Sequence, residues 1–154
     1  MSRSLGPSGE ALIKSFEAYR STAYPDEGGV PTIGWGHTGP DVTLYMAPCT
    51  MSQAQAWFDQ DTAHCVAVLD GVVPLSCTQN QFDACASLAY NIGTGAFLHS
   101  TLLAKLKAGD ISGAAAQFAV WDMVDGAQSA GLLRRRQAEQ ALFNLYSIVF
   151  RGFV

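Results

Sequence analysis

One short stretch of the chain differs sharply in composition from everything around it. Residues 21–40 contain five glycines, three prolines and β-forming residues such as Tyr24, Val30 and Ile33. Glycine and proline disfavour helix interiors, so no long helix is expected to cross this stretch. The mixture of β-formers and turn residues predicts a small irregular sheet or hairpin. The flanking sequence has apolar residues at helical spacing, so the chain is expected to be mostly helical with one short β segment near its N-terminus.

Helix-start residues divide the remaining sequence into helices. Ser8 is expected to begin the first helix, which ends near Arg20, and Ser52 is expected to begin a helix that Gly71 stops. Further helices are predicted from Thr78 through Ala89, from Ser100 to Gly109, from Asp110 through Phe118 and from about Ser129 to Ser147, with breaks at Gly93 and Gly95. The apolar run 146–154 is expected to pack on the core as a last helical turn.

Length and charge exclude several classes of protein. The 154 residues fit one domain, and only 14% of them are charged, with a net charge of −4. Nucleic-acid binding requires clustered cations, and the single basic cluster is residues 134–136, so no nucleic-acid partner is expected. No stretch supplies the roughly 20 apolar residues of a membrane span. The first ten residues lack the apolar core of a signal peptide.

The cysteines allow two readings. Cys49, Cys65, Cys77 and Cys85 can form two disulfides in three pairings, or remain four buried free thiols. No CxxC pair is present, and only three histidines accompany the thiols, so neither a metal site nor a zinc amidase is expected. We favour free thiols, and we expect no metal or other cofactor.

Two carboxylates and a hydroxyl lie close together in the sequence. Glu17 falls near the end of the first predicted helix, Asp26 lies in the following glycine-rich turn, and Thr32 follows six residues later. Glycoside hydrolysis needs one protonated carboxyl and one ionised carboxylate, with environments that separate their pKa values. Apolar neighbours suit Glu17 to the acid role, and the exposed turn suits Asp26 to the ionised role. From spacing alone, a solvated helix end and a turn aspartate explain the same residues.

A longer motif surrounds these residues. Residues 23–38 read AYPDEGGVPTIGWGHT, with eight residues between Glu17 and Asp26 and five between Asp26 and Thr32. Segments in the second half belong to the same pattern: residues 81–84, 91–97, 100–103, 109–115 and 131–139, together with Trp121. Over about residues 8–145 the sequence resembles the phage-type lysozymes, the T4-lysozyme-like endolysin muramidases of glycoside hydrolase family 24.

The resemblance implies a fold and a reaction. It implies one α+β, lysozyme-like domain over residues 1–154, with a small N-terminal β lobe, a helical lobe and a cleft between them. The reaction would be hydrolysis of the β-1,4 bond between N-acetylmuramic acid and N-acetylglucosamine in peptidoglycan, with inversion. Glu17 would be the general acid, Asp26 would assist the attacking water or stabilise positive charge, and Thr32 would position that water.

The resemblance also implies supporting residues. His37 would be structural, bound to a carboxylate of the helical lobe, and an arginine of the last helix would pair with Glu17. Arg135 is our first choice over Arg134 and Arg136. The residues that would line the sugar cleft are Asn91, Gly93, Thr94 and Gly95, although a helix C-cap and an interlobe loop would account for them equally well.

The resemblance also leads to expectations about the substrate, the oligomeric state and the cellular location of the protein. Peptidoglycan is the expected substrate of a monomer that waits in the host cytoplasm and reaches the periplasmic peptidoglycan after holin-type release. An export segment outside this sequence is the alternative. A lytic transglycosylase and a non-catalytic wall-binding module are the rival functions. The net negative charge of the chain predicts weak attraction to the anionic cell wall, with little dependence on salt.

Overall fold

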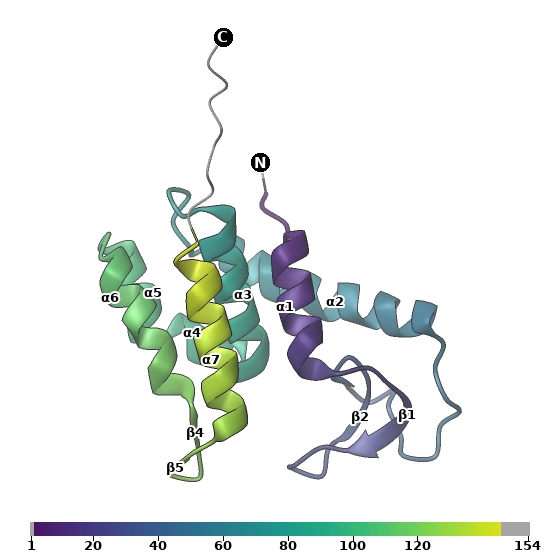
Figure 1. Cartoon of the computed structure of the whole chain (residues 1–154). Coiled ribbons are helices and arrows are strands. Elements are labelled where there is room, and N and C mark those ends of the chain that lie inside the picture. Colours follow the sequence, from purple (N-terminus) through teal and green to yellow (C-terminus); the bar gives the residue numbers. More distant parts are fainter. Residues whose placement is uncertain (1, 146–154) are drawn as a thin grey trace.

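Two lobes make up the molecule, and helix α1 leads from one into the other (Figure 1). The structure is a computed structural model that describes residues 2–145. The helices are α1 (Pro7–Glu17), α2 (Met51–Asp70), α3 (Gln79–Ile92), α4 (Thr94–Leu98), α5 (Thr101–Lys107), α6 (Ile111–Ala116), the 3-10 helix η1 (Gln117–Trp121) and α7 (Ala130–Phe143). The strands are β1 (Arg20–Pro25), β2 (Pro31–Gly34), β3 (His37–Thr38), β4 (Met123–Val124) and β5 (Ala127–Gln128).

The β lobe is a three-stranded antiparallel sheet in the order β1-β2-β3. Tyr24 of β1 lies opposite Thr32 of β2, and Ile33 of β2 lies opposite His37 of β3. A small apolar cluster around the fully buried Ile33 supports the sheet against the start of α2. The short β segment predicted for residues 21–40 is therefore confirmed, and so is the α+β class.

The helical lobe is built around α3. Every residue from Phe82 to Ala89 is buried, which is typical of a central helix surrounded by others. Helices α1, α2 and α7 all pack against it (Figure 1). Helices α5 and α6 complete the core through Leu102 and Ala114. This packing places the C-terminal end of α1 at the boundary between the lobes.

The start of α1 differs from the prediction. Gly6, not Ser8, is the N-cap, and no side chain of α1 caps the helix. Asp83 of α3 does so instead, since its Oδ1 accepts from the Gly6 amide at 2.9 Å and its Oδ2 from the Gly9 amide at 3.2 Å. The prediction failed because the capping group lies on another helix.

Other predicted boundaries were partly wrong. Helix α1 ends at Glu17 instead of near Arg20, because Ala18 adopts a positive φ of 48°. Thr50, not Ser52, caps α2, in a capping box with Gln53. The predicted caps Thr78, Ser100, Asp110 and Ser129 are confirmed.

Three further differences concern helix ends. Gly93 ends α3 as predicted, but Gly95 lies inside the short helix α4. The helix after Asp110 stops at Ala116 and continues as η1. Helix α7 ends at Phe143, and the predictions for residues 146–154, including Ser147, lie outside the described residues.

All four cysteines are free and buried, as favoured from the sequence. Burial raises the pKa of the Cys65 thiol to about 12, so this thiol is protonated at neutral pH. Within residues 2–145, no helix is long and apolar enough to cross a membrane. The same residues contain no group of three or more His, Cys, Asp or Glu side chains suited to a metal ion.

Candidate active site

Glu17 is the last residue of α1 and lies where the helical lobe meets the β lobe. The positive φ of Ala18 turns the chain out of the helix and into β1. The Glu17 side chain is 20% exposed, so it is partly shielded but open to solvent. The fold therefore places one carboxyl group at the junction of the lobes.

A buried arginine fixes the orientation of Glu17. Arg135 of α7 donates from Nη1 to Glu17 Oε1 at 2.7 Å, and its side chain is only 5% exposed. The same guanidinium donates to Glu139 Oε1 at 3.1 Å and to the Ser87 carbonyl at 3.3 Å. Arg135 thus connects Glu17 rigidly to α3 and α7, and its charge is shared between two carboxylates.

The second oxygen of Glu17 lies against a glycine. A Cβ added to Gly36 would sit 2.7 Å from Glu17 Oε2, closer than real Cβ contacts. Gly36 also has a φ of +80°, a conformation that other residues rarely adopt. Both requirements explain why glycine stands at position 36, a role that the sequence analysis missed.

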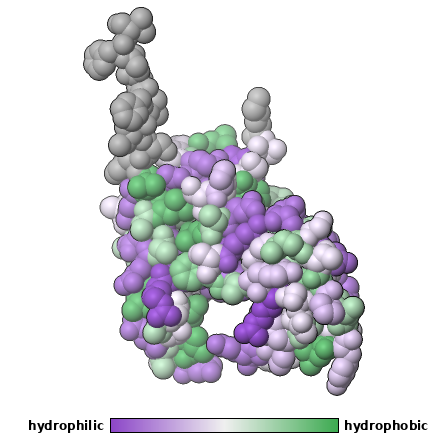
Figure 2. Space-filling model, turned by 45° about the vertical axis from the view of Figure 1, so that its right-hand side comes forward, coloured by the Kyte–Doolittle hydropathy of each residue, from purple (hydrophilic) through white to green (hydrophobic). Residues whose placement is uncertain are grey.

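Asp26 approaches the same region from the β lobe. Its Oδ1 accepts from the amides of Gly28 at 2.9 Å and Val30 at 2.8 Å, so the turn holds the carboxylate in place. Asp26 and Glu17 line one hollow of about 700 Å³ between the lobes. Figure 2 shows an open gap between the lobes with strongly hydrophilic side chains on its rim.

A second hollow of about 370 Å³ lies on the other side of Glu17. Glu17 and Asn91 line both hollows, so the two meet at the carboxyl group. Gly93 and Thr94 also line the smaller hollow, whereas Gly95 lines neither. Three of the four predicted sugar-cleft residues are therefore brought together with Glu17.

Thr32 is placed differently from the other predicted residues. It lies on β2, is 3% exposed and lines neither hollow. Its hydroxyl donates to the Val30 carbonyl at 2.9 Å. Thr32 is therefore a buried residue of β2 outside both hollows, close in sequence to the turn that carries Asp26.

His37 connects the two lobes. Its Nδ1 lies 2.8 Å from Asp61 Oδ2 of α2, and its Nε2 lies 3.2 Å from Asp41 Oδ2. The ring stacks on Trp57 of α2, with centroids 4.9 Å apart and planes 6° apart. These contacts hold β3 against α2, and none of them involves Glu17 or Asp26.

A cluster of buried charges, not predicted from the sequence, lies behind the site. Glu139 is fully buried, and its Oε2 lies 2.9 Å from Arg136 Nε, while its Oε1 accepts from the Ser87 hydroxyl at 2.7 Å. Burial raises the pKa of Glu139, and both guanidinium groups and the Ser87 hydroxyl oppose that shift. Arg136 also donates to Asn91 Oδ1 at 2.7 Å. The spacing of Glu139 from the two arginines along α7 was the available signal.

Known proteins resemble this chain in sequence. The phage lysozyme family model matches residues 14–139. An endolysin of Acyrthosiphon pisum secondary endosymbiont phage 1 is 44% identical over 140 residues, which cover 88% of this chain and 94% of that protein. An endolysin of Bacillus phage PZA is 42% identical over 145 residues, covering 91% of this chain and 55% of that protein.

Solved structures agree with the sequence relatives. The endolysin from Escherichia coli O157:H7 phage FAHEc1 superposes with a TM-score of 0.86 at 34% identity, covering 94% of this chain and 95% of that one. The muramidase domain of SpmX from Asticaccaulis excentricus gives 0.85 at 34% identity, covering 94% and 99%.

The fold is shared with a solved endolysin and a solved muramidase domain, and the chain is a lysozyme, an enzyme that hydrolyses peptidoglycan. The chain belongs to the phage lysozyme family, as its sequence motif indicated.

Proposed function

We propose that this endolysin cleaves the β-1,4 bond between N-acetylmuramic acid and N-acetylglucosamine with Glu17 as general acid and Asp26 as its ionised partner. One observation carries the proposal: the two carboxyl groups come from different lobes, line one hollow, and are each held by hydrogen bonds. That arrangement suits a sugar chain passing between them.

The reaction would proceed as a single displacement. Protonated Glu17 gives its proton to the glycosidic oxygen as the bond from that oxygen to the sugar C1 breaks, so that the next sugar leaves as an alcohol and positive charge develops at C1. Asp26 takes a proton from a water molecule, which attacks C1 from the opposite face and inverts its configuration. Asp26 is suited to this step because Oδ1 makes both backbone hydrogen bonds, which leaves Oδ2 available to water.

Turbidity clearing of outer-membrane-stripped Gram-negative cells tests the two carboxylates. Glu17→Gln should lose at least about 10²–10⁴-fold in rate, the usual contribution of acid–base catalysis, and Asp26→Asn should also clear poorly. Asp59→Asn, an exposed change on α2 away from both hollows, is the matched control. Comparable clearing by all variants would remove this site assignment.

Product analysis tests the bond and the stereochemistry. Mass spectrometry of digested peptidoglycan should find reducing muramic acid ends, and NMR during the reaction should find the inverted anomer first. Muropeptides with 1,6-anhydro ends would instead identify a lytic transglycosylase, which needs no ionised partner.

We further propose that Thr32 positions the attacking water and that Asn91, Gly93 and Thr94 contact the sugars, whereas Gly95, which lines neither hollow, makes no such contact. The Thr32 hydroxyl donates to Val30 and so keeps its oxygen lone pairs for a water hydrogen. Thr32→Val should lower kcat, whereas Thr32→Ser should retain most of it. Equal activity of the two variants would remove Thr32 from the mechanism.

We also propose that the chain works as a monomeric single domain and reaches the periplasmic peptidoglycan after holin-type release from the host cytoplasm. Relatives of this chain carry the name endolysin, and those of phages Mu and P21 carry the name SAR-endolysin. Expression in Escherichia coli should lyse cells only when a holin is co-expressed, and light scattering should give one chain per particle. Lysis without a holin would contradict the release route.

A further inference from the structure

Arg134 differs from the other cations near the site. Arg135 and Arg136 are buried and paired with Glu139, and Arg135 also holds Glu17. Arg134 is exposed, yet it lines the larger hollow together with Glu17 and Asp26. It makes no hydrogen bond or ion pair with any residue that the structure describes. An arginine without a partner in a substrate cleft is available to an anionic group of the substrate.

The surroundings of Arg134 favour an anion on the helical side of this hollow. The residues contributed there by β4 and the start of α7 are Val124, Ser129, Gly131, Leu132, Arg134 and Arg135, and none is acidic. The carboxylates Asp26 and Glu27 belong to the β lobe on the opposite side, and the Glu17 carboxylate at the end of α1 is already paired with Arg135. A negatively charged substituent directed toward α7 would therefore meet a cation and neutral side chains.

The volumes of the two hollows also favour an anionic substituent of the substrate near Arg134. The hollow with Arg134 measures about 700 Å³, against about 370 Å³ for the one with Asn91, Gly93 and Thr94. Both meet at Glu17, so a glycan bound at the carboxyl group would extend into each. The larger hollow has room for a sugar that carries a further substituent. In peptidoglycan, that substituent is the peptide stem on N-acetylmuramic acid, which bears free carboxylates.

We propose that Arg134 binds a carboxylate of the peptide stem and thereby makes the enzyme favour peptide-bearing glycan. This inference rests on the proposed function, since it assumes that the glycan crosses the cleft at Glu17. Guanidinium groups bind carboxylates through two parallel hydrogen bonds, which gives orientation as well as charge complementarity. Arg134 is in this view a substrate-binding residue and takes no part in proton transfer.

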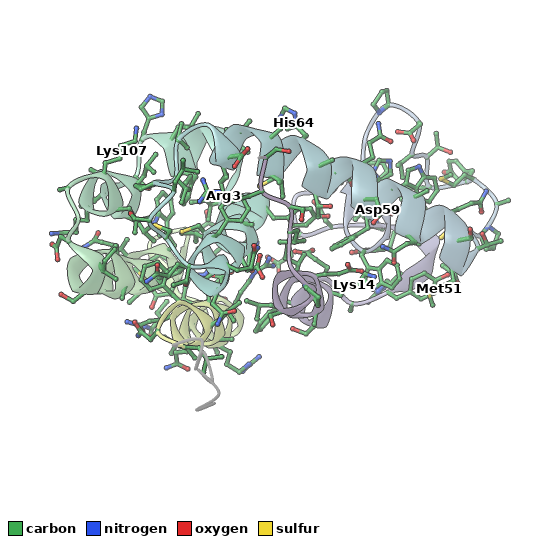
Figure 3. All side chains as sticks on the ribbon, turned by 90° about the horizontal axis from the view of Figure 1, so that it is seen from above. Arg3, Lys14, Met51, Asp59, His64 and Lys107 are labelled. Atoms are coloured by element: carbon green, nitrogen blue, oxygen red, sulfur yellow. The ribbon has the colours of Figure 1, made fainter. Side chains whose placement is uncertain are left out.

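The experiment compares one soluble substrate in two charge forms. Uncrosslinked glycan strands with their stems are used as prepared, and after conversion of the stem carboxylates to amides. On native strands, Arg134→Gln should raise KM about two- to tenfold and change kcat less than twofold. On amidated strands, wild type and Arg134→Gln should have the same KM. Arg134→Lys should recover part of the difference, and Lys107→Gln, an exposed change at the end of α5 (Figure 3), should behave as wild type.

Two results would overturn the proposal. An unchanged KM for Arg134→Gln on native strands would show that Arg134 makes no useful contact. An equal loss on native and amidated strands would show that Arg134 acts on the sugars or on the β lobe instead. Binding of both strand forms, measured in a Glu17→Gln background, separates this inference from the mechanism. A stem preference that persists there supports the Arg134 contact even if the assignment of Glu17 fails.

Discussion

At the scale of single residues, the candidate site depends on the close approach of the Glu17 carboxylate to the backbone of Gly36. Gly36 allows the Glu17 carboxylate to occupy space that any side chain at position 36 would fill. Glu17 is therefore confined on one side by backbone and on the other by the Arg135 guanidinium. Such confinement holds an acid group in one orientation, which proton transfer to a fixed oxygen requires.

Gly36→Ala should abolish most activity, because the new methyl group would push Glu17 away from its position. Gly109→Ala is the matched control, since Gly109 has a similar φ of +78° but nothing within 4 Å of its Cβ position. Both variants should lose comparable stability in thermal unfolding, and only Gly36→Ala should lose its rate of wall clearing. Equal activities would show that the contact with Glu17 is unimportant.

The sequence indicated candidate site residues where spacing was local and left others open. Glu17 and Asp26 lie within ten residues of each other, so the motif could single them out. Arg135 lies 118 residues after Glu17, and three adjacent arginines were candidates until the packing of α7 on α3 placed one of them toward the cleft. Gly36 belongs to the motif, but its function depends on its contact with Glu17, which the spacing of residues along the chain cannot predict.

At the scale of elements, α1 relies on another helix for its start. The amides of Gly6 and Gly9 both bond to Asp83, which is 1% exposed and also accepts from Gln79. Local caps such as Thr78 with Gln81 were predicted because donor and acceptor lie within one turn. The cap from Asp83 was not, because donor and acceptor are more than 70 residues apart.

Asp83→Ala should destabilise the protein by about 1–3 kcal/mol, because two amides lose their buried acceptor. Hydrogen exchange should show the largest loss of protection in α1. Asp59→Ala, an exposed change on α2, should stay within about 0.5 kcal/mol of wild type. A loss of protection spread evenly over all helices would contradict a local role for Asp83.

Lys14 gives a second connection between helices. Its side chain reaches from α1 toward α2 (Figure 3), where Nζ bonds to Gln55 at 2.5 Å, and it also pairs with Glu10 at 2.6 Å. The ammonium lies 4.2 Å from the centroid of the Trp35 ring. This cation therefore packs α1 against both α2 and the β lobe.

Glu139→Gln should destabilise the protein by about 3–5 kcal/mol in urea unfolding, because the buried Arg136 would lose its counter-charge and Arg135 would keep only Glu17. Activity should fall as well, since Glu139 anchors the arginine that holds Glu17. Glu10→Gln removes a pairing with Lys14 in which the Glu10 side chain is 42% exposed, so it should cost at most about 1 kcal/mol. Similar losses for both variants would argue against a special role for the buried cluster.

At the scale of the whole molecule, the charge balance governs approach to the wall. The net charge of −4 gives no long-range attraction to an anionic polymer. Many of the cations are committed to internal pairs, among them Arg3 with Asp70 and Lys105 with Asp110. Binding to the wall must therefore depend on short-range contacts inside the cleft.

The initial rate of wall clearing should change less than about tenfold between 50 and 200 mM salt, a range over which the Debye length falls about twofold. Electrostatic steering raises association rates at least about tenfold, and this enzyme lacks the net positive charge that would provide it. A positively charged lysozyme measured beside it should lose rate steeply over the same range. A steep loss for this enzyme too would show that a local basic surface steers it to the wall.

The position of α1 along the chain has a consequence for when the site can assemble during synthesis. Helix α1 leaves the ribosome well before its packing partners α3 and α7 and the arginine that orients Glu17. Helices that wait for distant partners gain little stability of their own. A nascent chain therefore carries an unassembled site until α7 has emerged, so we expect translation products that end before α7 to lack wall-clearing activity.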